Sequence, residues 1–200
     1  MSDFKFEFPV GATPLNPNEL AGLKLSYIST QKELNAAEQD NILQGEIWAF
    51  SQKRKDFLSE KFMRDLHKRL FGEVWKWAGV YRTTDKSIGV EWFNIPTEMQ
   101  KLIEDVRYWL THETYSLDEA AVRFHHRLVW IHPFPNGNGR WARTMADVLL
   151  FNMNGVRFTW GAKLKEGTLD EHGGAREKYI HSLQMADAKK IAELLKFARS

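Results

Sequence analysis

Cysteine is absent from this sequence of 200 residues. That absence excludes a disulfide scaffold, a thiolate nucleophile and a zinc site built on cysteine, and it suits a reducing compartment. No apolar run approaches the roughly 18–20 residues that span a membrane. The first ten residues, MSDFKFEFPV, lack the basic segment and apolar segment of a secretion signal. We therefore expect a cytoplasmic protein that has no membrane partner.

An excess of charge is also missing. The 28 lysines and arginines nearly balance 26 aspartates and glutamates, for a net charge of +2. Nothing in these totals points to nucleic acid as a direct partner. Hydrophobic residues at 43% and charged residues at 27% are typical of a folded globular chain. The length suits one domain, and repeats and low-complexity tracts are lacking.

Helical spacing of apolar residues dominates the chain after an arm of 28 residues rich in proline and turn formers. In the first helix the expected inward stripe is Leu34, Ala37, Ile42, Ile47, Trp48 and Phe50. The segment 79–94, GVYRTTDKSIGVEWFN, breaks the helical pattern and predicts a short hairpin or flap. The predicted helices cover about 29–51, 56–71, 96–112, 117–131, 139 to a stop at Gly155, 168–186 and 188–199.

The fold class that follows is mainly α, a helical bundle with one short β-hairpin flap. We divide the chain into residues 1–54, an arm and a helix packed on the core, and a core domain of residues 55–200.

The stretch 131–143, IHPFPNGNGRWAR, joins two of the predicted helices. Gly137 and Gly139 permit backbone angles at which consecutive N–H groups turn inward and form an anion nest. The helix that follows adds its positive N-terminal dipole at the same point. Arg140 and Arg143 lie on its first turn, where the dipole favours acids instead, so we expect a bound anion such as a phosphate.

Two more side chains of this loop suit phosphoryl chemistry. His132 lies just after the first of the two helices, and an imidazole beside a phosphate nest is a natural general base for a hydroxyl nucleophile. Asn136 immediately precedes the nest, and its side-chain oxygen is a candidate ligand for Mg²⁺ on a bound phosphate.

The run from His132 to Arg143 resembles the signature of Fic-domain proteins, His-x-Phe-x-Asp/Glu-Gly-Asn-Gly-Arg-x-x-Arg. Every fixed position matches except Asn136, where the family usually has an acid. The upstream flap and the helix pattern at 176–198 also agree, so the resemblance covers about residues 55–198. The chain looks most like a subgroup called mobile mystery protein B. This likeness is carried by the N-terminal sequence, the flap sequence DKSIGV and the loop sequence HPFPNGNGR.

The resemblance implies a Fic-fold protein adenylyltransferase that moves AMP from ATP onto a Ser, Thr or Tyr hydroxyl of a target protein. It implies His132 as catalytic base, Phe134 as the structural anchor of the loop, and Asn136 as ligand of Mg²⁺, with Mn²⁺ as a substitute. A regulatory or antitoxin-like protein is a further implied partner. The residues implied to bind the phosphates are Gly137, Asn138, Gly139, Arg140 and Arg143.

Two further elements follow from the resemblance. Many Fic proteins carry an inhibitory helix with Ser/Thr-x-x-x-Glu-Gly/Asn, and here Ser29 and Glu33 fit that pattern whereas Leu34 does not. The alternative is that Glu33 only complements its helix dipole. The flap residues Lys86, Ser87, Ile88, Gly89 and Val90 are expected to dock an extended target segment as an added strand, with a purely structural hairpin as the alternative.

The neutral Asn136 keeps a second class of function open. An amide oxygen coordinates Mg²⁺ without contributing charge, so metal affinity is expected to fall. The alternatives are a weakly active or non-catalytic phosphate-binding regulator, or a transferase of UMP, GMP or phosphocholine.

Overall fold

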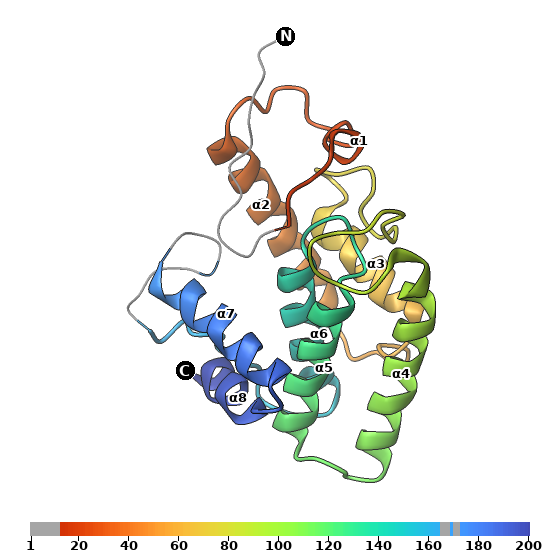
Figure 1. The fold of residues 1–200 in the computed structure, drawn as a ribbon, viewed down its shortest axis with the longest axis vertical. Coiled ribbons are helices and arrows are strands. Elements are labelled where there is room, and N and C mark those ends of the chain that lie inside the picture. The colour runs from red at the N-terminus through yellow and green to blue at the C-terminus, as the bar shows by residue number, and fades with distance from the viewer. Residues whose placement is uncertain (1–12, 165–168, 170–172) are drawn as a thin grey trace.

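The computed structural model describes residues 13–164, 169 and 173–200 of the chain. The phenylalanine-rich start of the predicted arm and part of the predicted 168–186 helix lie outside the described residues. Within them the fold is a helical bundle, as predicted (Figure 1). The elements are α1 (Pro17–Leu20), α2 (Gln31–Phe50), α3 (Glu60–Phe71), η1 (Trp92–Asn94), α4 (Ile95–Thr111), α5 (Leu117–Ile131), α6 (Asn138–Asn152), α7 (Gly174–Asp187) and α8 (Ile191–Arg199).

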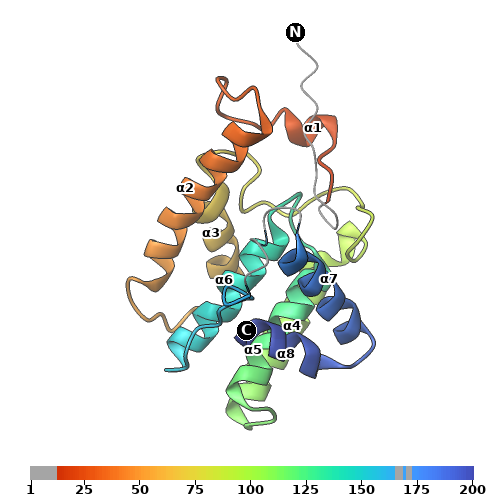
Figure 2. The ribbon, with the colours of Figure 1, turned by 90° about the vertical axis from the view of Figure 1, so that its left-hand side faces the viewer.

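The antiparallel pair of α5 and α6 forms the centre of the bundle, with the site-bearing loop at one end. α2 lies along α3 on one side of this pair, and α7 and α8 pack together on the other (Figure 2). α4 packs along α5. The loop 132–137 is thus surrounded by elements from both halves of the chain.

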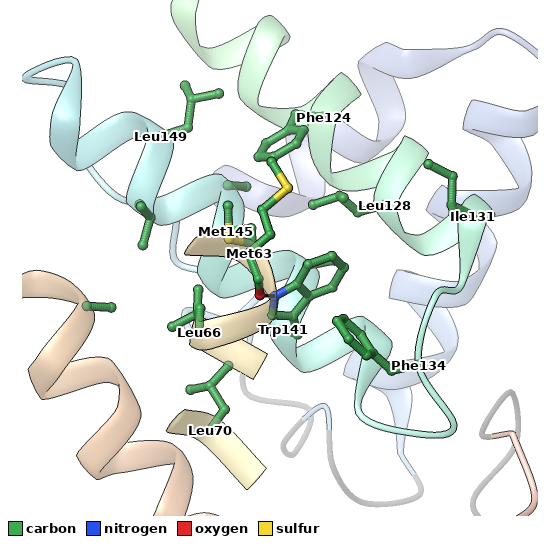
Figure 3. Packing of buried hydrophobic residues seen from close by; sticks show 14 of the residues in the cluster. Met63, Leu66, Leu70, Phe124, Leu128, Ile131, Phe134, Trp141, Met145 and Leu149 are labelled. Atoms are coloured by element: carbon green, nitrogen blue, oxygen red, sulfur yellow. Dashed lines mark hydrogen bonds between the residues drawn. The ribbon is translucent and has the colours of Figure 1, made fainter. Parts of the chain in front are cut away.

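Side chains from α3, α5 and α6 meet around the fully buried Trp141 (Figure 3). Its indole N–H donates to the carbonyl of Met63 at 2.9 Å, so the one polar atom of the ring is satisfied within the core. Burial of an aromatic of this size contributes about 3–5 kcal/mol against truncation to alanine. The start of α6 is therefore fixed in space. The labelled core residues of the figure are Met63, Leu66, Leu70, Phe124, Leu128, Ile131, Phe134, Trp141, Met145 and Leu149.

The inward face of α2 differs from the predicted apolar stripe. Ile47, expected to point inward, is 57% exposed. Gly45 lets α2 approach α3 closely, because an added Cβ there would lie 2.8 Å from the Leu70 side chain and 3.0 Å from the Arg69 backbone. This close contact rotates small and polar residues inward. The buried residues of α2 are Leu34, Glu38, Asn41, Gly45 and Ala49.

The segment predicted as a hairpin or flap turns back on itself without a strand ladder between residues 79 and 91. The guanidinium of Arg82 supplies the contacts that cross-strand bonds would have made. It donates to the carbonyl of Thr84 at 2.8 Å and also to that of Val90. Within the described residues, β-pairing is limited to one antiparallel bridge between Leu23 and Trp75.

Candidate functional site

Two left-handed residues shape the loop between α5 and α6. His132 ends α5 with φ of 54°, and Gly137 precedes α6 with φ of 78°. A Cβ on Gly137 would lie 2.7 Å from the Phe71 ring, so both the backbone angle and the space require glycine. The conformation of the loop thus follows directly from the glycine of the sequence.

His132 is nearly buried and makes a contact with each ring nitrogen. Its Nδ1 lies 3.2 Å from the carbonyl of Val129, and its Nε2 lies 2.8 Å from the hydroxyl of Thr13. A carbonyl only accepts, so Nδ1 carries the proton and Nε2 holds a lone pair. Burial, together with the smaller effect of the positive charges of Arg82 and Lys86, lowers the pKa of His132 to about 4, although the hydrogen bond to Val129 acts in the opposite direction. The ring is neutral at physiological pH, as a proton acceptor must be.

The loop is held together by the side chain of Asn138. Its Oδ1 accepts the N–H of Phe134 at 2.9 Å, and its Nδ2 donates to the carbonyl of the same residue at 2.8 Å. Phe134 is fully buried, with its ring centre 3.7 Å from that of His67. His67 in turn lies 3.1 Å from the carbonyl of Asn136. The stack of Phe134 on His67 and these three hydrogen bonds therefore hold the loop in its conformation.

The first turn of α6 presents backbone N–H groups at the loop. The amides of Asn138 and Gly139 begin the helix and lie too early in it for a helical carbonyl partner, and Gly137 makes no side-chain cap. The N–H of Gly137, predicted to bind phosphate, donates instead to Oδ1 of Asn136 at 2.6 Å. The nest therefore rests on the helix amides of Asn138 and Gly139.

Both predicted arginines face the same cavity, but each has contacts within the chain. Nη1 of Arg140 lies 2.6 Å from Oε2 of Glu38 on α2. Arg143 lies over the ring of Tyr179 on α7, with its guanidinium carbon 5.5 Å from the ring centre. Oε1 of Glu38 also accepts the indole N–H of Trp75 at 2.6 Å, which fixes the carboxylate in place.

The predicted metal ligand, Asn136, has both ends of its amide engaged. Besides the bond from Gly137, its Nδ2 donates to the carbonyl of Thr13 at 3.0 Å. In the described part of the chain, no group of three or more His, Cys, Asp or Glu side chains is placed to hold a metal ion. Asn136 is therefore not part of a cluster of protein ligands, and phosphate oxygens would have to supply most ligands of any divalent ion bound there.

The candidate inhibitory residues, Ser29 and Glu33, contact each other at the start of α2. The Glu33 carboxylate accepts the backbone N–H groups of Ser29 at 2.8 Å and Thr30 at 3.0 Å. These hydrogen bonds, that from the Ser29 backbone first, lower its pKa. Glu33 is thus the capping-box acid of α2, and a different acid on the same helix, Glu38, reaches the signature.

The flap residues divide into two groups. Ser87, Ile88 and Gly89 line the cavity, whereas Lys86 forms an ion pair with Glu19 of the arm at 2.5 Å. The flap is tied to the loop by backbone bonds from Arg82 to Pro133 at 2.9 Å and from Val90 to Ile131 at 3.3 Å.

A cavity of about 1400 Å³ connects these parts, above the roughly 300–1,000 Å³ usual for small-molecule sites. It is bordered by the loop, α2, α7 and the flap, which leaves room for a nucleotide beside an extended peptide. The site residues that line it are Thr13, Glu38, Ser87, Ile88, Gly89, His132, Asn136, Gly137, Asn138, Gly139, Arg140, Arg143 and Tyr179.

Several of these residues were missed by sequence reasoning. Glu38 carried a signal, because it stands on one helical face with Leu34 and Gly45, at spacings of four and seven residues. Thr13 and Tyr179 carried none, since only the folded chain brings residues 13, 132 and 179 together.

An amide-lined helix N-terminus, two arginines and a neutral imidazole thus border one cavity in this helical fold. Residues 57–150 match the family model described as Fic/DOC family. This part of the chain is a Fic-family domain.

Curated relatives extend the likeness beyond that region. A probable protein adenylyltransferase of Aquifex aeolicus is 28% identical over 195 residues, which are 90% of this chain and 56% of that protein. A protein adenylyltransferase Fic of Culex quinquefasciatus is 32% identical over 148 residues, 72% of this chain and 27% of that protein. The chain thus spans about half the length, or less, of these relatives.

Solved structures share the fold. BepC of Bartonella tribocorum with bound AMPPNP has a TM-score of 0.69 at 14% identity, covering 92% of this chain and 97% of that one. An N-terminal Fic domain of Bartonella quintana with bound ADP has a TM-score of 0.64 at 17% identity, covering 87% and 86%. None of the helices in the described residues is both long and apolar enough to cross a membrane.

Proposed function

We propose that this chain is a protein adenylyltransferase that transfers AMP from ATP to a hydroxyl side chain of a protein. The observation that carries the proposal is the lone pair on Nε2 of His132, which faces a hydroxyl 2.8 Å away at the edge of the cavity. The proposal is supported by the relatives from Aquifex and Culex, which are named as protein adenylyltransferases. It is also supported by the nucleotides bound in the two Bartonella structures.

In the proposed reaction, Nε2 of His132 takes the proton of the target hydroxyl, whose oxygen attacks the α-phosphorus of ATP. The bond between that phosphorus and the bridging oxygen breaks, and pyrophosphate leaves. The amides of Asn138 and Gly139 and the guanidinium of Arg143 hold phosphate oxygens on which negative charge develops. Mg²⁺ or Mn²⁺ enters this scheme as the counter-ion of ATP.

The test is incubation of the purified chain with ATP, GTP, UTP and CTP, each labelled at the α-phosphate, and with a protein extract. Transfer of label from ATP is expected, and His132→Ala is expected to lose about 10²–10⁴-fold of the rate. Label transfer that survives His132→Ala unchanged would contradict the role of the imidazole, and transfer from another nucleotide alone would contradict the choice of AMP.

Asn136 favours a second candidate, a weakly active or non-catalytic nucleotide binder. Its Oδ1 already accepts the N–H of Gly137 at 2.6 Å, which leaves less for a cation. Asn136→Asp restores the acid usual in the family. A rate that rises in this variant and saturates at lower Mg²⁺ indicates a weakened metal site, whereas inactivity of both forms favours the binding function.

We also propose that α2 restrains the enzyme, through Glu38 in place of Glu33. The carboxylate of Glu38 forms an ion pair with the guanidinium of Arg140. A distal phosphate of the nucleotide would otherwise bind this guanidinium. The Glu38 side chain is 9% exposed, so water weakens this pair little. A nucleotide has to displace the carboxylate before its distal phosphate binds there.

Glu38→Gln separates this restraint from packing, because glutamine keeps an acceptor for the Trp75 indole and removes the negative charge. The variant is expected to raise AMP transfer and lower the KM for ATP. Glu33→Gln is the control on the same helix, and it should change stability without changing transfer. Equal activation by both variants would contradict the proposal.

Three finer expectations remain part of the proposal. The proposed membership of the mobile mystery protein B subgroup rests on the sequences of the flap and the loop. The proposed cytoplasmic location rests on the lack of cysteine. The proposed regulatory partner rests on the resemblance to the Fic family. Docking of a target along Ser87–Gly89 is supported by their position on the cavity wall.

A further inference from the structure

The arm before α1 enters the active site and places a hydroxyl on the catalytic imidazole. Thr13 is 5% exposed, and its Oγ1 lies 2.8 Å from Nε2 of His132. In Figure 1 this segment runs from α1 toward the loop between α5 and α6. The two residues are 119 positions apart in the sequence, so their contact is a feature of the folded chain alone.

The direction of this hydrogen bond is determined by the other ring nitrogen. Nδ1 donates to the carbonyl of Val129, so Nε2 accepts and the Thr13 hydroxyl is the donor. A nucleophilic hydroxyl that donates to a neutral imidazole is the ground-state arrangement of general-base catalysis. Thr13 thus holds the position assigned above to the hydroxyl of a target.

The backbone around Thr13 is held on both sides of the site. Its carbonyl accepts from Nδ2 of Asn136 at 3.0 Å, and the next carbonyl, of Pro14, accepts from Nζ of Lys86 at 3.1 Å. Lys86 is in turn paired with Glu19, and their side chains are 6% and 11% exposed. The loop and the flap therefore both bind the backbone of this segment through its carbonyl groups, as they could bind an extended peptide.

A short tether keeps the arm in place. Glu19 accepts the backbone N–H of Asn16 in a capping box at the start of α1. Beyond α1, the N–H of Lys24 donates to Val74 at 2.9 Å and the N–H of Lys76 donates to Gly22 at 2.8 Å. Eight residues, 14–21, separate Thr13 from Gly22, so the hydroxyl is present at a high effective concentration without any encounter between molecules.

We infer that Thr13 is a site of self-AMPylation in cis, with residues 13–15 as the built-in peptide substrate of the proposed transferase. The inference rests on the proposed adenylyltransferase function. It names the acceptor that the chain itself supplies, and any outside target would have to displace the same segment.

The covalent step is balanced by groups already named. Oγ1 of Thr13 forms a bond to the α-phosphorus of ATP, and its proton moves to Nε2 of His132. The bond from that phosphorus to the bridging oxygen breaks, and pyrophosphate departs with the bonding electrons. The product is a phosphodiester that joins Oγ1 of Thr13 to adenosine through the α-phosphorus, and no oxidant or reductant is required.

The experiment uses the full chain with Mg-ATP, in the wild type and in Glu38→Gln, so that the proposed restraint does not mask the reaction. Intact mass measures the AMP adduct, peptide mapping locates it, and a coupled assay measures pyrophosphate. Thr13→Val removes the hydroxyl at nearly constant volume, and Thr13→Ser keeps it. Thermal unfolding of each variant confirms that it is folded.

The expected result is one AMP on Thr13, lost in Thr13→Val, regained in Thr13→Ser, and formed at a fractional rate that does not change on dilution. An adduct on another residue, persistence of the adduct in Thr13→Val, or a rate that falls on dilution would overturn the inference and leave the proposed function standing. Absence of both adduct and pyrophosphate from both backgrounds, with or without added protein extract, would overturn the two together.

Discussion

Two glycines at the start of α6, separated by one residue, have different roles. Gly137 has a left-handed backbone, and an added Cβ would lie 2.7 Å from the Phe71 ring. At Gly139 the nearest atoms to an added Cβ are the Tyr179 hydroxyl at 3.7 Å and Nη1 of Arg143 at 3.9 Å, which are ordinary contacts. The first glycine is required by the fold, and the second leaves space beside Arg143, which we propose binds phosphate.

We expect Gly137→Ala to lower the free energy of unfolding by about 1–3 kcal/mol, from left-handed strain and the contact with Phe71. Gly139→Ala should change stability by less than about 1 kcal/mol, since alanine favours a helix. Urea unfolding of both variants measures the difference. Equal stability of the two variants would show that the loop tolerates another backbone path.

At the scale of elements, Arg82 joins the flap to the loop 132–137. Its Nε donates to the carbonyl of His132 at 2.7 Å, and its other nitrogens donate to Thr84 and Val90. His132 has a left-handed backbone, which is costly for a residue with a side chain. A guanidinium that binds three carbonyls stabilises this residue and the flap at once, although burial lowers the pKa of Arg82.

Arg82→Lys keeps the charge but loses the planar set of donors. We expect a loss of about 2–4 kcal/mol in unfolding free energy, because buried carbonyls lose their partners. Amide hydrogen exchange across residues 83–91 should also become faster. The control is Arg107→Lys, because Arg107 donates to the Leu58 carbonyl at 2.9 Å and to no flap residue. Faster flap exchange in both variants, or in neither, would argue against a specific link.

At the scale of the whole molecule, the sequence was sufficient for most helices and for the position of the loop. Periodicity places α5 at its observed bounds and α6 within about three residues of its own, because their faces are apolar, Ser116 precedes α5 and Gly155 follows α6. Periodicity failed for α2, whose buried face includes Glu38 and Asn41. Those polar residues are inward because partners on other elements satisfy them, and no local pattern reveals such partners.

The site was predictable only in its contiguous part. His132 to Arg143 follow one another in the chain, so their chemistry and turn residues are visible in the sequence. Thr13, Glu38 and Tyr179 reach the same cavity from three other segments, and their roles depend on tertiary packing. The arm and α2 thus contribute the contacts that decide which groups a substrate has to displace.

Buried histidines should make this fold sensitive to acid. Burial lowers the pKa of His67 and His125 to about 3 and that of His132 to about 4, against 6.5 in the unfolded chain. Below pH 6.5 the unfolded state therefore binds up to three protons that the folded state does not. The free energy of unfolding consequently decreases as the pH is lowered. Asp147 acts in the opposite direction, because burial raises its pKa to about 6 and the folded state takes up its proton first.

Between about pH 4.5 and 6 the net difference is two protons, three from the histidines less one from Asp147, so unfolding free energy should fall by about 2.7 kcal/mol per pH unit. His125→Phe removes one of these histidines and should halve that slope, to about 1.4 kcal/mol per pH unit. Urea unfolding at half-unit steps from pH 4.5 to 7.5 measures both slopes. A flat profile in the wild type would mean that these imidazoles become protonated within the folded state, which their burial in the core opposes.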